Sequence, residues 1–302
     1  MFDQASVVFQ TDYVLWAVPL FFLALLIEWV WARRKSPSIY ESSDLRVSLG
    51  VMSITVLIDV IPKFLAIVLM FVCYEASPFK GLISGAWYWW VLLFLLDDFI
   101  YYWHHRLNHE VRILWAGHVP HHNSEHYHYG TALRQGVCER VLKYLFWLPL
   151  PLLGFHPLMV VTMLSFSLIY QFWLHTQSVG KLPRLVEFFF NTPSHHRVHH
   201  GSNTRYLDRN HGATLIIWDR LFGSFAEECD HEPVKYGVTK PLSKQTAVAA
   251  SFEEYAHLLA DLRRATRLID KLRYLFMAPG WSHDGEDKRS STLRAQQMGG
   301  RV

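Results

Sequence analysis

The sequence predicts an all-α fold: a polytopic membrane helical bundle of about four to five apolar helices with a histidine-rich helical cap on its cytoplasmic side. Of the 302 residues, 51% are hydrophobic and 15% aromatic but only 18% are charged, and the apolar residues gather in runs long enough to cross a bilayer. A formal charge of +3 is too small to indicate nucleic acid as a partner. The three cysteines form no CxxC pair, so neither a disulfide framework nor a thiolate zinc site is predicted.

Residues 1–85 are expected to form an N-terminal transmembrane region with two spans. The first apolar run, Tyr13 to Trp31, is followed directly by the basic residues 33–35. The positive-inside rule therefore places the end of this span in the cytoplasm and the N-terminus outside. The second apolar run, Leu49 to Tyr74, is also long enough to cross a bilayer.

Residues 86–226 are expected to form the histidine-box domain. A third apolar run, Ala86 to Tyr102, leads directly into the first histidines and contains Asp97 and Asp98. Two interpretations of these acids stay open. Either an acid accepts a hydrogen bond from the far nitrogen of a metal-binding histidine, or both are helix-end acids at the membrane surface.

Two further apolar runs, Val137 to Leu153 and Pro157 to Leu174, are separated by a turn at Gly154. Together they predict a helical hairpin that crosses the membrane, or dips into it, and returns. In either case both histidine stretches lie on the cytoplasmic side, so they can form one shared site. The choice between crossing and dipping leaves the number of spans at about four or five.

Residues 227–302 are expected to lie in the cytoplasm as an amphipathic helix and a disordered tail. The helical periodicity over Phe252 to Phe276, with several basic residues, fits either a helix on anionic headgroups or a soluble amphipathic helix. From Pro279 onward the chain is rich in glycine, serine and charge. With little to bury, this tail is predicted to be disordered.

Eight of the histidines recur at helical spacing in three short boxes. The first box reads HxxxH and the next two read HxxHH, so the imidazoles of each box lie on one side of a helix. A neutral imidazole is the commonest side-chain metal ligand, and eight are more than one tetrahedral zinc can use. Two adjacent metals fit the count better. The expected ligands are His105, His109, His118, His121, His122, His196, His199 and His200.

The remaining histidines carry weaker signals. His175 lies between the boxes, at the cytoplasmic end of the last apolar run, and is a further ligand candidate because of this placement. His104 and His195 each precede a box histidine, so on a helix they point about 100° away from it. Weaker still are His126, His128 and His211.

The residues of the boxes limit which metal ions the site is expected to bind. All-imidazole sites suit zinc, copper, iron or nickel. A zinc hydrolase of the HExxH type needs a glutamate after the first histidine, but Arg106 stands there. A redox metal pair near a membrane indicates activation of oxygen for attack on lipid C–H bonds. A non-enzymatic metal transporter is the alternative, but it would place histidines along a path across the membrane rather than at one face.

The order HxxxH, HxxHH, HxxHH between hydrophobic runs resembles the fatty acid hydroxylase / sterol desaturase superfamily of membrane di-iron enzymes. The resemblance covers about Trp87 to Phe225. Its segments DDFIYYWHHRLNHE, HVPHHNSEHYHYGTALRQ, QFWLHT and NTPSHHRVHH are especially similar to the alkylglycerol monooxygenase branch and its bacterial relatives.

This resemblance implies two irons held by the eight box histidines, and His175 is similar to an additional ligand in family members. Glu110 and Glu125 match acids that flank the boxes in the alkylglycerol branch, which makes them candidates for catalysis. Where that branch carries NYG, this chain has NHG at residues 210–212, a difference that bears on the substrate.

The family implies O2-dependent hydroxylation of a fatty acyl, alkylglycerol or sterol-like lipid, with a desaturase on the same metal core as the alternative. The chain lacks a haem-binding HPGG motif, so it carries no fused cytochrome b5 domain. Electrons are therefore expected from a separate donor of the cytochrome b5, ferredoxin or tetrahydrobiopterin type.

Overall fold

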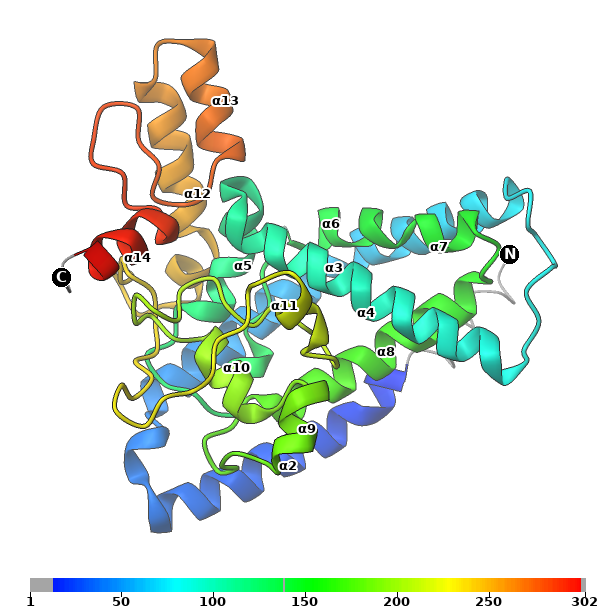
Figure 1. Cartoon of the computed structure of the whole chain (residues 1–302), viewed down its shortest axis with the longest axis horizontal. Coiled ribbons are helices and arrows are strands. Elements are labelled where there is room, and N and C mark those ends of the chain that lie inside the picture. Colours follow the sequence, from blue (N-terminus) through cyan, green and yellow to red (C-terminus); the bar gives the residue numbers. More distant parts are fainter. Residues whose placement is uncertain (1–12, 138, 300–302) are drawn as a thin grey trace.

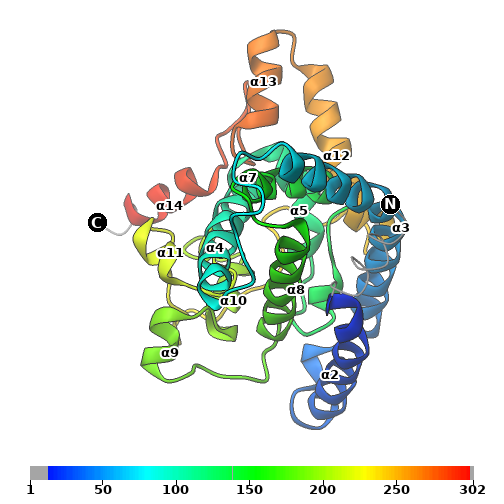
Figure 2. The same ribbon diagram turned by 90° about the vertical axis from the view of Figure 1, so that its right-hand side faces the viewer.

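The computed structural model describes residues 13–137 and 139–299. Within these ranges the chain consists of helices and loops, with no β-strand and only isolated bridges. The predicted all-α class is thus confirmed (Figure 1, Figure 2). The longest helices are α2 (Tyr13–Lys35), α3 (Ser42–Glu75), α4 (Trp87–Glu110) and α8 (Pro157–Leu174). The shorter elements are η1 (Pro37–Ile39), α5 (Arg112–His122), η2 (Thr131–Leu133), α6 (Glu139–Lys143), η3 (Tyr144–Trp147), α7 (Pro149–Leu152), α9 (Arg184–Phe189), α10 (Pro193–His199), α11 (Ile217–Leu221), α12 (Ala247–Arg264), α13 (Leu268–Phe276) and α14 (Ser290–Gly299).

Three helices in the described part of the chain are long and apolar enough to cross a membrane: α2, α3 with the short η1 before it, and α8. Large apolar side chains on α2 and α3 remain exposed, with Trp16 at 70% and Leu57 at 79%, which suits contact with lipid rather than water. Helix α8 is more enclosed, because α2 and α4 pack along it. The chain is therefore an integral membrane protein, and the total of four to five spans stays a prediction.

The apolar run from residue 137 to 153 is broken, as its prolines predict. It is divided into α6, η3 and α7, because Pro149 and Pro151 lack the N–H that a continuous helix needs. These short turns pack against α4 and α8 and build the largest apolar core of the bundle. Its buried members are Met70, Leu93, Trp147, Leu150, Phe155, Val160, Met163 and Leu164.

A buried carboxylate fixes the basic end of α2 to the loops near the histidines. Glu28 accepts hydrogen bonds from the Tyr40 hydroxyl, the Thr176 hydroxyl and the backbone N–H of Tyr129. The last two donors lie in loops that follow α8 and α5. As a result, the end of α2 that carries three basic residues lies on the same side of the bundle as His175.

The amphipathic segment near the C-terminus forms two helices rather than one. Helices α12 and α13 form a hairpin that projects away from the spans (Figure 1, Figure 2). The base of α12 packs on α3 and α5, where Ala250 contacts Val47 and Val51. The Arg112 guanidinium at the start of α5 pairs with Glu254 and Asp261 of α12, at 3.0 and 2.7 Å.

The prediction of a disordered tail is wrong for residues 279–299. Trp281 packs edge-on against Tyr274, and Arg289 pairs with Asp287 and so stabilises the loop before α14. Helix α14 is held by Arg294, which donates to the carbonyl of Leu207. Composition misled here because the order of this segment depends on local ion pairs and one aromatic anchor, not on a run of apolar residues.

Candidate metal centre

The nine histidines predicted as ligands all come together in two adjacent groups. Every one is buried, and within each group one nitrogen from each ring lies within 4.8 Å of the others. The five-histidine group consists of His105, His109, His118, His122 and His199, and the four-histidine group consists of His121, His175, His196 and His200.

Four elements position these rings. The last turns of α4 carry His105 and His109, and α5 carries all three histidines of the second box. His175 is the residue that ends α8. The third box lies on the short α10, which begins at Pro193, a residue whose fixed backbone angle suits the first turn of a helix. Each box thus projects its imidazoles into the space between α4, α5, α8 and α10.

Backbone carbonyls fix the protonation of four rings. His105 Nδ1 lies 2.9 Å from the His211 oxygen, and His121 Nδ1 lies 3.0 Å from the Arg134 oxygen. Because a carbonyl can only accept, Nδ1 must carry the proton and Nε2 of the neutral ring is left with a free lone pair. The same holds for His175 on the Gln171 oxygen and His199 on the Arg209 oxygen, both at 2.9 Å.

The free lone pairs face one another, an arrangement that a cation between them would stabilise. Nε2 of His121 lies 3.1 Å from Nε2 of His175, and both are acceptors because their Nδ1 protons are already donated to carbonyls. Two buried acceptors at this distance form no hydrogen bond and repel each other. Nε2 of His109, His199 and His200 is also buried without a hydrogen-bond partner in the described chain. Metal ions bound by these nitrogens would satisfy all of them, so the donor set fits the expected metal.

Burial keeps the imidazoles neutral, as metal ligation requires. Removal from water, followed by the charge of neighbouring imidazoles, lowers the pKa well below its usual value for His121, His122, His196, His199 and His200. Burial likewise lowers the pKa of His175 to about 4. At neutral pH these rings present lone pairs to a metal rather than protons.

Two carboxylates contact the five-histidine group from outside. Asp208 Oδ1 lies 3.3 Å from Nδ1 of His109, and Glu139 Oε2 lies 3.3 Å from Nδ1 of His118. Burial alone would raise the pKa of each acid, but its imidazole partner outweighs burial and lowers the pKa. Both groups therefore stay ionised beside the rings.

This arrangement agrees with what sequence comparison finds. Residues 90–224 match the family model of the fatty acid hydroxylases, within the predicted histidine-box region of residues 86–226. This segment is therefore similar to a fatty acid hydroxylase domain. Over 199 residues the chain is 45% identical to the alkylglycerol monooxygenase of Danio rerio, covering 66% of this chain and 44% of the relative.

Two further alkylglycerol monooxygenases are similar over nearly the whole chain. The human protein is 37% identical over 279 residues and the Xenopus tropicalis protein 38% over 275, each covering 89% of this chain and 60% of the relative. The chain therefore spans less than two thirds of the length of these relatives. No solved structure matches it.

The two acids expected to take part in catalysis lie outside both histidine groups. Glu110 accepts a hydrogen bond from Arg106 at 2.9 Å, and its side chain is 41% exposed. Glu125 is exposed as well. The acids that contact the histidines are Glu139 and Asp208 instead. No helical spacing links either of these to a box, so the sequence offered no signal for them.

The two acids in the middle of α4 are buried and bind other partners. Asp97 accepts from the indole N–H of Trp147 at 2.7 Å. Asp98 accepts from the backbone N–H of Thr214 and from Trp218, both at 2.8 Å. Neither of the two interpretations from the sequence is therefore correct, because these acids fix α4 to the loops around it and contact neither ligand histidines nor the membrane surface.

His104 and His195, which were expected to point away from the metals, belong to neither histidine group. His104 packs against Phe146 and Trp147, and His195 pairs with Glu187 at 3.0 Å. His211 is closer to the centre than its weak sequence signal indicated. It is fully buried, and its ring centre lies 5.1 Å from that of His109.

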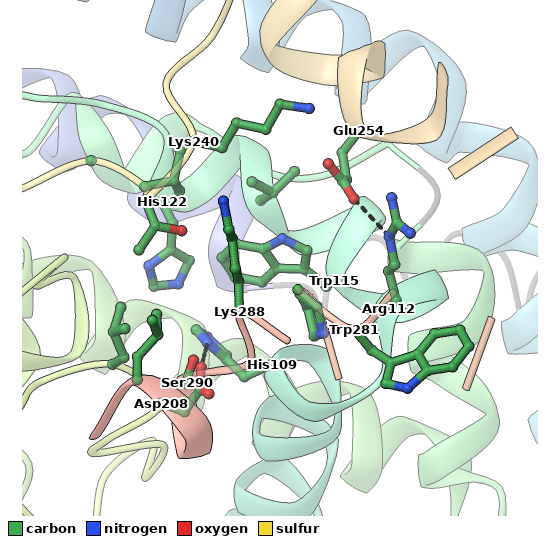
Figure 3. A pocket seen from close by; sticks show the side chains of 18 of the residues that line it. His109, Arg112, Trp115, His122, Asp208, Lys240, Glu254, Trp281, Lys288 and Ser290 are labelled. Atoms are coloured by element: carbon green, nitrogen blue, oxygen red, sulfur yellow. Dashed lines mark hydrogen bonds and ion pairs between the residues drawn. The ribbon is translucent and has the colours of Figure 1, made fainter. Parts of the chain in front are cut away.

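A cavity of about 870 Å³ opens beside the histidine groups. His109 and His122 of the five-histidine group line its inner end, together with Trp115 (Figure 3). Its outer walls include Lys240 and Trp281, the latter from the tail segment predicted to be disordered. The tail segment thus forms part of the wall of a cavity that the histidines also line.

Proposed function

We propose that the protein is a membrane-bound, non-haem di-iron oxidoreductase that uses O2 to hydroxylate a lipid. The observation that carries this proposal is the pair of adjacent all-histidine groups with opposed Nε2 lone pairs. In the balanced reaction, the substrate C–H, O2, two electrons and two protons give the C–OH product and water. The electrons come from a separate donor of the cytochrome b5, ferredoxin or tetrahydrobiopterin type.

Bound iron would supply the redox chemistry that activates O2 towards an unactivated C–H bond. The five-histidine and four-histidine groups are the residues proposed to hold the two ions. The chain itself contributes geometry: carbonyls that orient the rings, helices that exclude water from the centre, and a cavity that reaches it. We assign no proton transfer to Glu110 or Glu125, because neither lies beside the histidines.

A fatty acyl, alkylglycerol or sterol-like lipid is the proposed substrate class. The similarity to alkylglycerol monooxygenases supports it, and so does the similarity to an ornithine lipid hydroxylase and a lathosterol oxidase, at 28% and 29% identity over about half of this chain. A desaturase on the same metal core would give a new double bond in place of a hydroxyl, so the product separates the two activities.

We further propose that the active site lies on the cytoplasmic side, with the N-terminus outside. The basic residues 33–35 end α2 on the side of the bundle where Glu28 contacts Thr176, next to His175. The positive-inside rule places that side in the cytoplasm. Reporter fusions at the two termini test this, and a C-terminus on the outer side would contradict the layout.

The decisive experiment combines metal analysis with product analysis. The purified protein is loaded anaerobically with ferrous iron and then given air, a reductant and membrane lipid extract. We expect about two irons per chain, lipid-dependent O2 consumption and a hydroxylated lipid in the mass spectrum. His121→Ala should abolish all three, while His257→Ala, a surface histidine beside Glu254, should not. Fewer than about one iron per chain, with zinc held tightly instead, would refute the redox proposal.

A further inference from the structure

One short loop of four residues contacts three rings of the five-histidine group. Asp208 Oδ1 accepts from Nδ1 of His109 at 3.3 Å, and the Arg209 oxygen accepts from Nδ1 of His199 at 2.9 Å. The His211 oxygen accepts from Nδ1 of His105, also at 2.9 Å. Residues 208–211 therefore set the orientation of rings that come from both α4 and α10.

The loop is held in a conformation that its sequence favours. Asp208 and Asn210 have φ angles of 50° and 57°, a left-handed region that aspartate and asparagine tolerate better than other non-glycine residues. The Asn210 amide donates to the carbonyls of His195 and Ala226, at 3.0 and 2.8 Å. The Asp219 carboxylate accepts hydrogen bonds from the backbone N–H groups of His211 and Gly212, both at 2.8 Å. Fixed on three sides, the loop is a rigid support for the rings.

The two histidine groups differ in this outer support. In the five-histidine group, four rings contact an oxygen from outside, and for two of them the oxygen belongs to a carboxylate, Asp208 or Glu139. In the four-histidine group, the corresponding supports are the carbonyls that hold His121 and His175. Among the residues that the structure describes, neither Nδ1 of His196 nor Nδ1 of His118 has a hydrogen-bond partner, but Nδ1 of His118 lies 3.3 Å from the Glu139 carboxylate, whereas no carboxylate lies beside Nδ1 of His196.

We propose that Asp208 and Glu139 are positioning residues that make the five-histidine group the tighter of the two metal positions, so that it fills first. A carboxylate behind an imidazole fixes the ring and raises its basicity as a ligand, and loss of such a partner typically lowers metal affinity about 10–100-fold. The five-histidine group also offers one ligand more than its neighbour. This inference rests on the proposed metal centre.

The test is an anaerobic titration of the metal-free, full-length protein in detergent with ferrous iron alone. The wild-type protein should bind iron in two resolved steps of about one ion each. Asp208→Asn and Glu139→Gln, which remove the charge but keep an oxygen and the shape, should weaken the first step about 10–100-fold and leave the second in place. Co2+ as a second probe gives the visible spectrum of the first ion bound, which reports its ligand set independently of activity.

Glu187→Gln is the matched control. Glu187 pairs with His195 at 3.0 Å, so it is the same kind of acid–histidine pair on an adjacent element, but His195 belongs to neither group. Its loss should leave both binding steps and the Co2+ spectrum unchanged. The thermal unfolding midpoint of each variant is measured alongside, so that a misfolded variant is recognised.

Several results would overturn the inference. Wild-type protein that fills both positions with equal affinity contradicts it. The inference is also contradicted if Asp208→Asn and Glu139→Gln both fold and both bind the first iron as tightly as the wild type. An equal loss in Glu187→Gln would show a general effect of removing an acid and would also contradict it. Wild-type protein that binds neither metal contradicts the proposed function as a whole, and is thereby distinguished from failure of this inference alone.

Discussion

Replacement of Arg134 should damage the fold strongly although its side chain contacts no proposed metal ligand. Its side chain is fully buried. It donates to Ser48 at 2.9 Å and to Asn123 at 2.7 Å, and it pairs with the Asp44 carboxylate. These three partners belong to α3 and to the residue after α5, while the carbonyl of Arg134 itself accepts from His121. The guanidinium thus joins a span to the second histidine box.

Arg134→Met keeps the length of the side chain and removes its charge and donors. Removing one partner of a buried ion pair typically costs about 3–5 kcal/mol, because the other charge is left without compensation. At about 2–4 °C per kcal/mol, the thermal unfolding midpoint should fall by about 6–20 °C. Arg134→Lys keeps the charge but not the planar fork that reaches three partners, so its cost should be smaller. Iron per folded chain should fall in Arg134→Met because His121 loses its fixed orientation.

A double-mutant cycle with Asp44→Asn tests the reasoning. If the two charges depend on each other, Arg134→Met in the Asp44→Asn background should cost less than in the wild type, by about 0.5–3 kcal/mol. The measurement is the unfolding midpoint in one detergent at one protein concentration. An unchanged midpoint in Arg134→Met, or additive effects in the double mutant, would refute the account of a coupled buried pair.

Three further predictions follow from single contacts. His175→Ala should lower iron occupancy as severely as replacement of a box histidine, since Nε2 of His175 faces Nε2 of two other rings at 3.0 and 3.1 Å. The measurement is iron per chain, and His257→Ala is the control that should be unaffected. Gly136→Ala should disorder the loop beside α5, because a Cβ there would lie 1.3 Å from the Gly117 oxygen. We expect less iron per chain and a lower thermal unfolding midpoint. An unfolding midpoint equal to that of the wild type would contradict this prediction. Although burial raises the pKa of Glu187, hydrogen bonds outweigh it and lower the pKa to about 2. A carboxylate whose pKa is lowered in the folded protein stabilises the fold at pH values above the pKa of the unfolded chain, which is about 4.3. The stabilisation by Glu187 should therefore disappear as the pH falls from about 4.5 to 2. Over that window, the free energy of unfolding of Glu187→Gln should fall less than that of the wild type.

The box histidines were predictable because their geometry is local. Residues three and four apart on a helix share a side whatever the rest of the fold does, so the ligand rings of α4, α5 and α10 followed from spacing alone. His175 has no such partner, and only the end of α8 brings it to His121. Its prediction depended on its order in the chain and on the family resemblance.

The outer contacts were not predictable because they join loops across long stretches of chain. Asp208 reaches His109 from 99 residues away, and Asn210 adopts a left-handed angle that no spacing rule detects. Asp97 and Asp98, by contrast, lie about two turns before His105 and were natural candidates. On α4 they point to Trp147 and to the loop after residue 212 instead. Proximity in sequence selected the wrong acids, since hydrogen bonding to a ring depends on tertiary packing.

The partition of each HxxHH box explains how one motif supplies ligands to both of the proposed metal positions. Around a helix axis, residue i+4 is rotated by about 40° from residue i, and residue i+3 is rotated by about 60° from residue i in the opposite direction. In α5 the pair His118 and His122 joins the five-histidine group and His121 turns to the other. In α10 the roles are exchanged, because the pair His196 and His200 joins the four-histidine group and His199 turns to the five-histidine group. Each box therefore contributes a pair to one position and a single ring to the other. The two histidine groups cannot move apart without breaking both helices, so helical spacing alone would fix the separation of the two proposed metal positions.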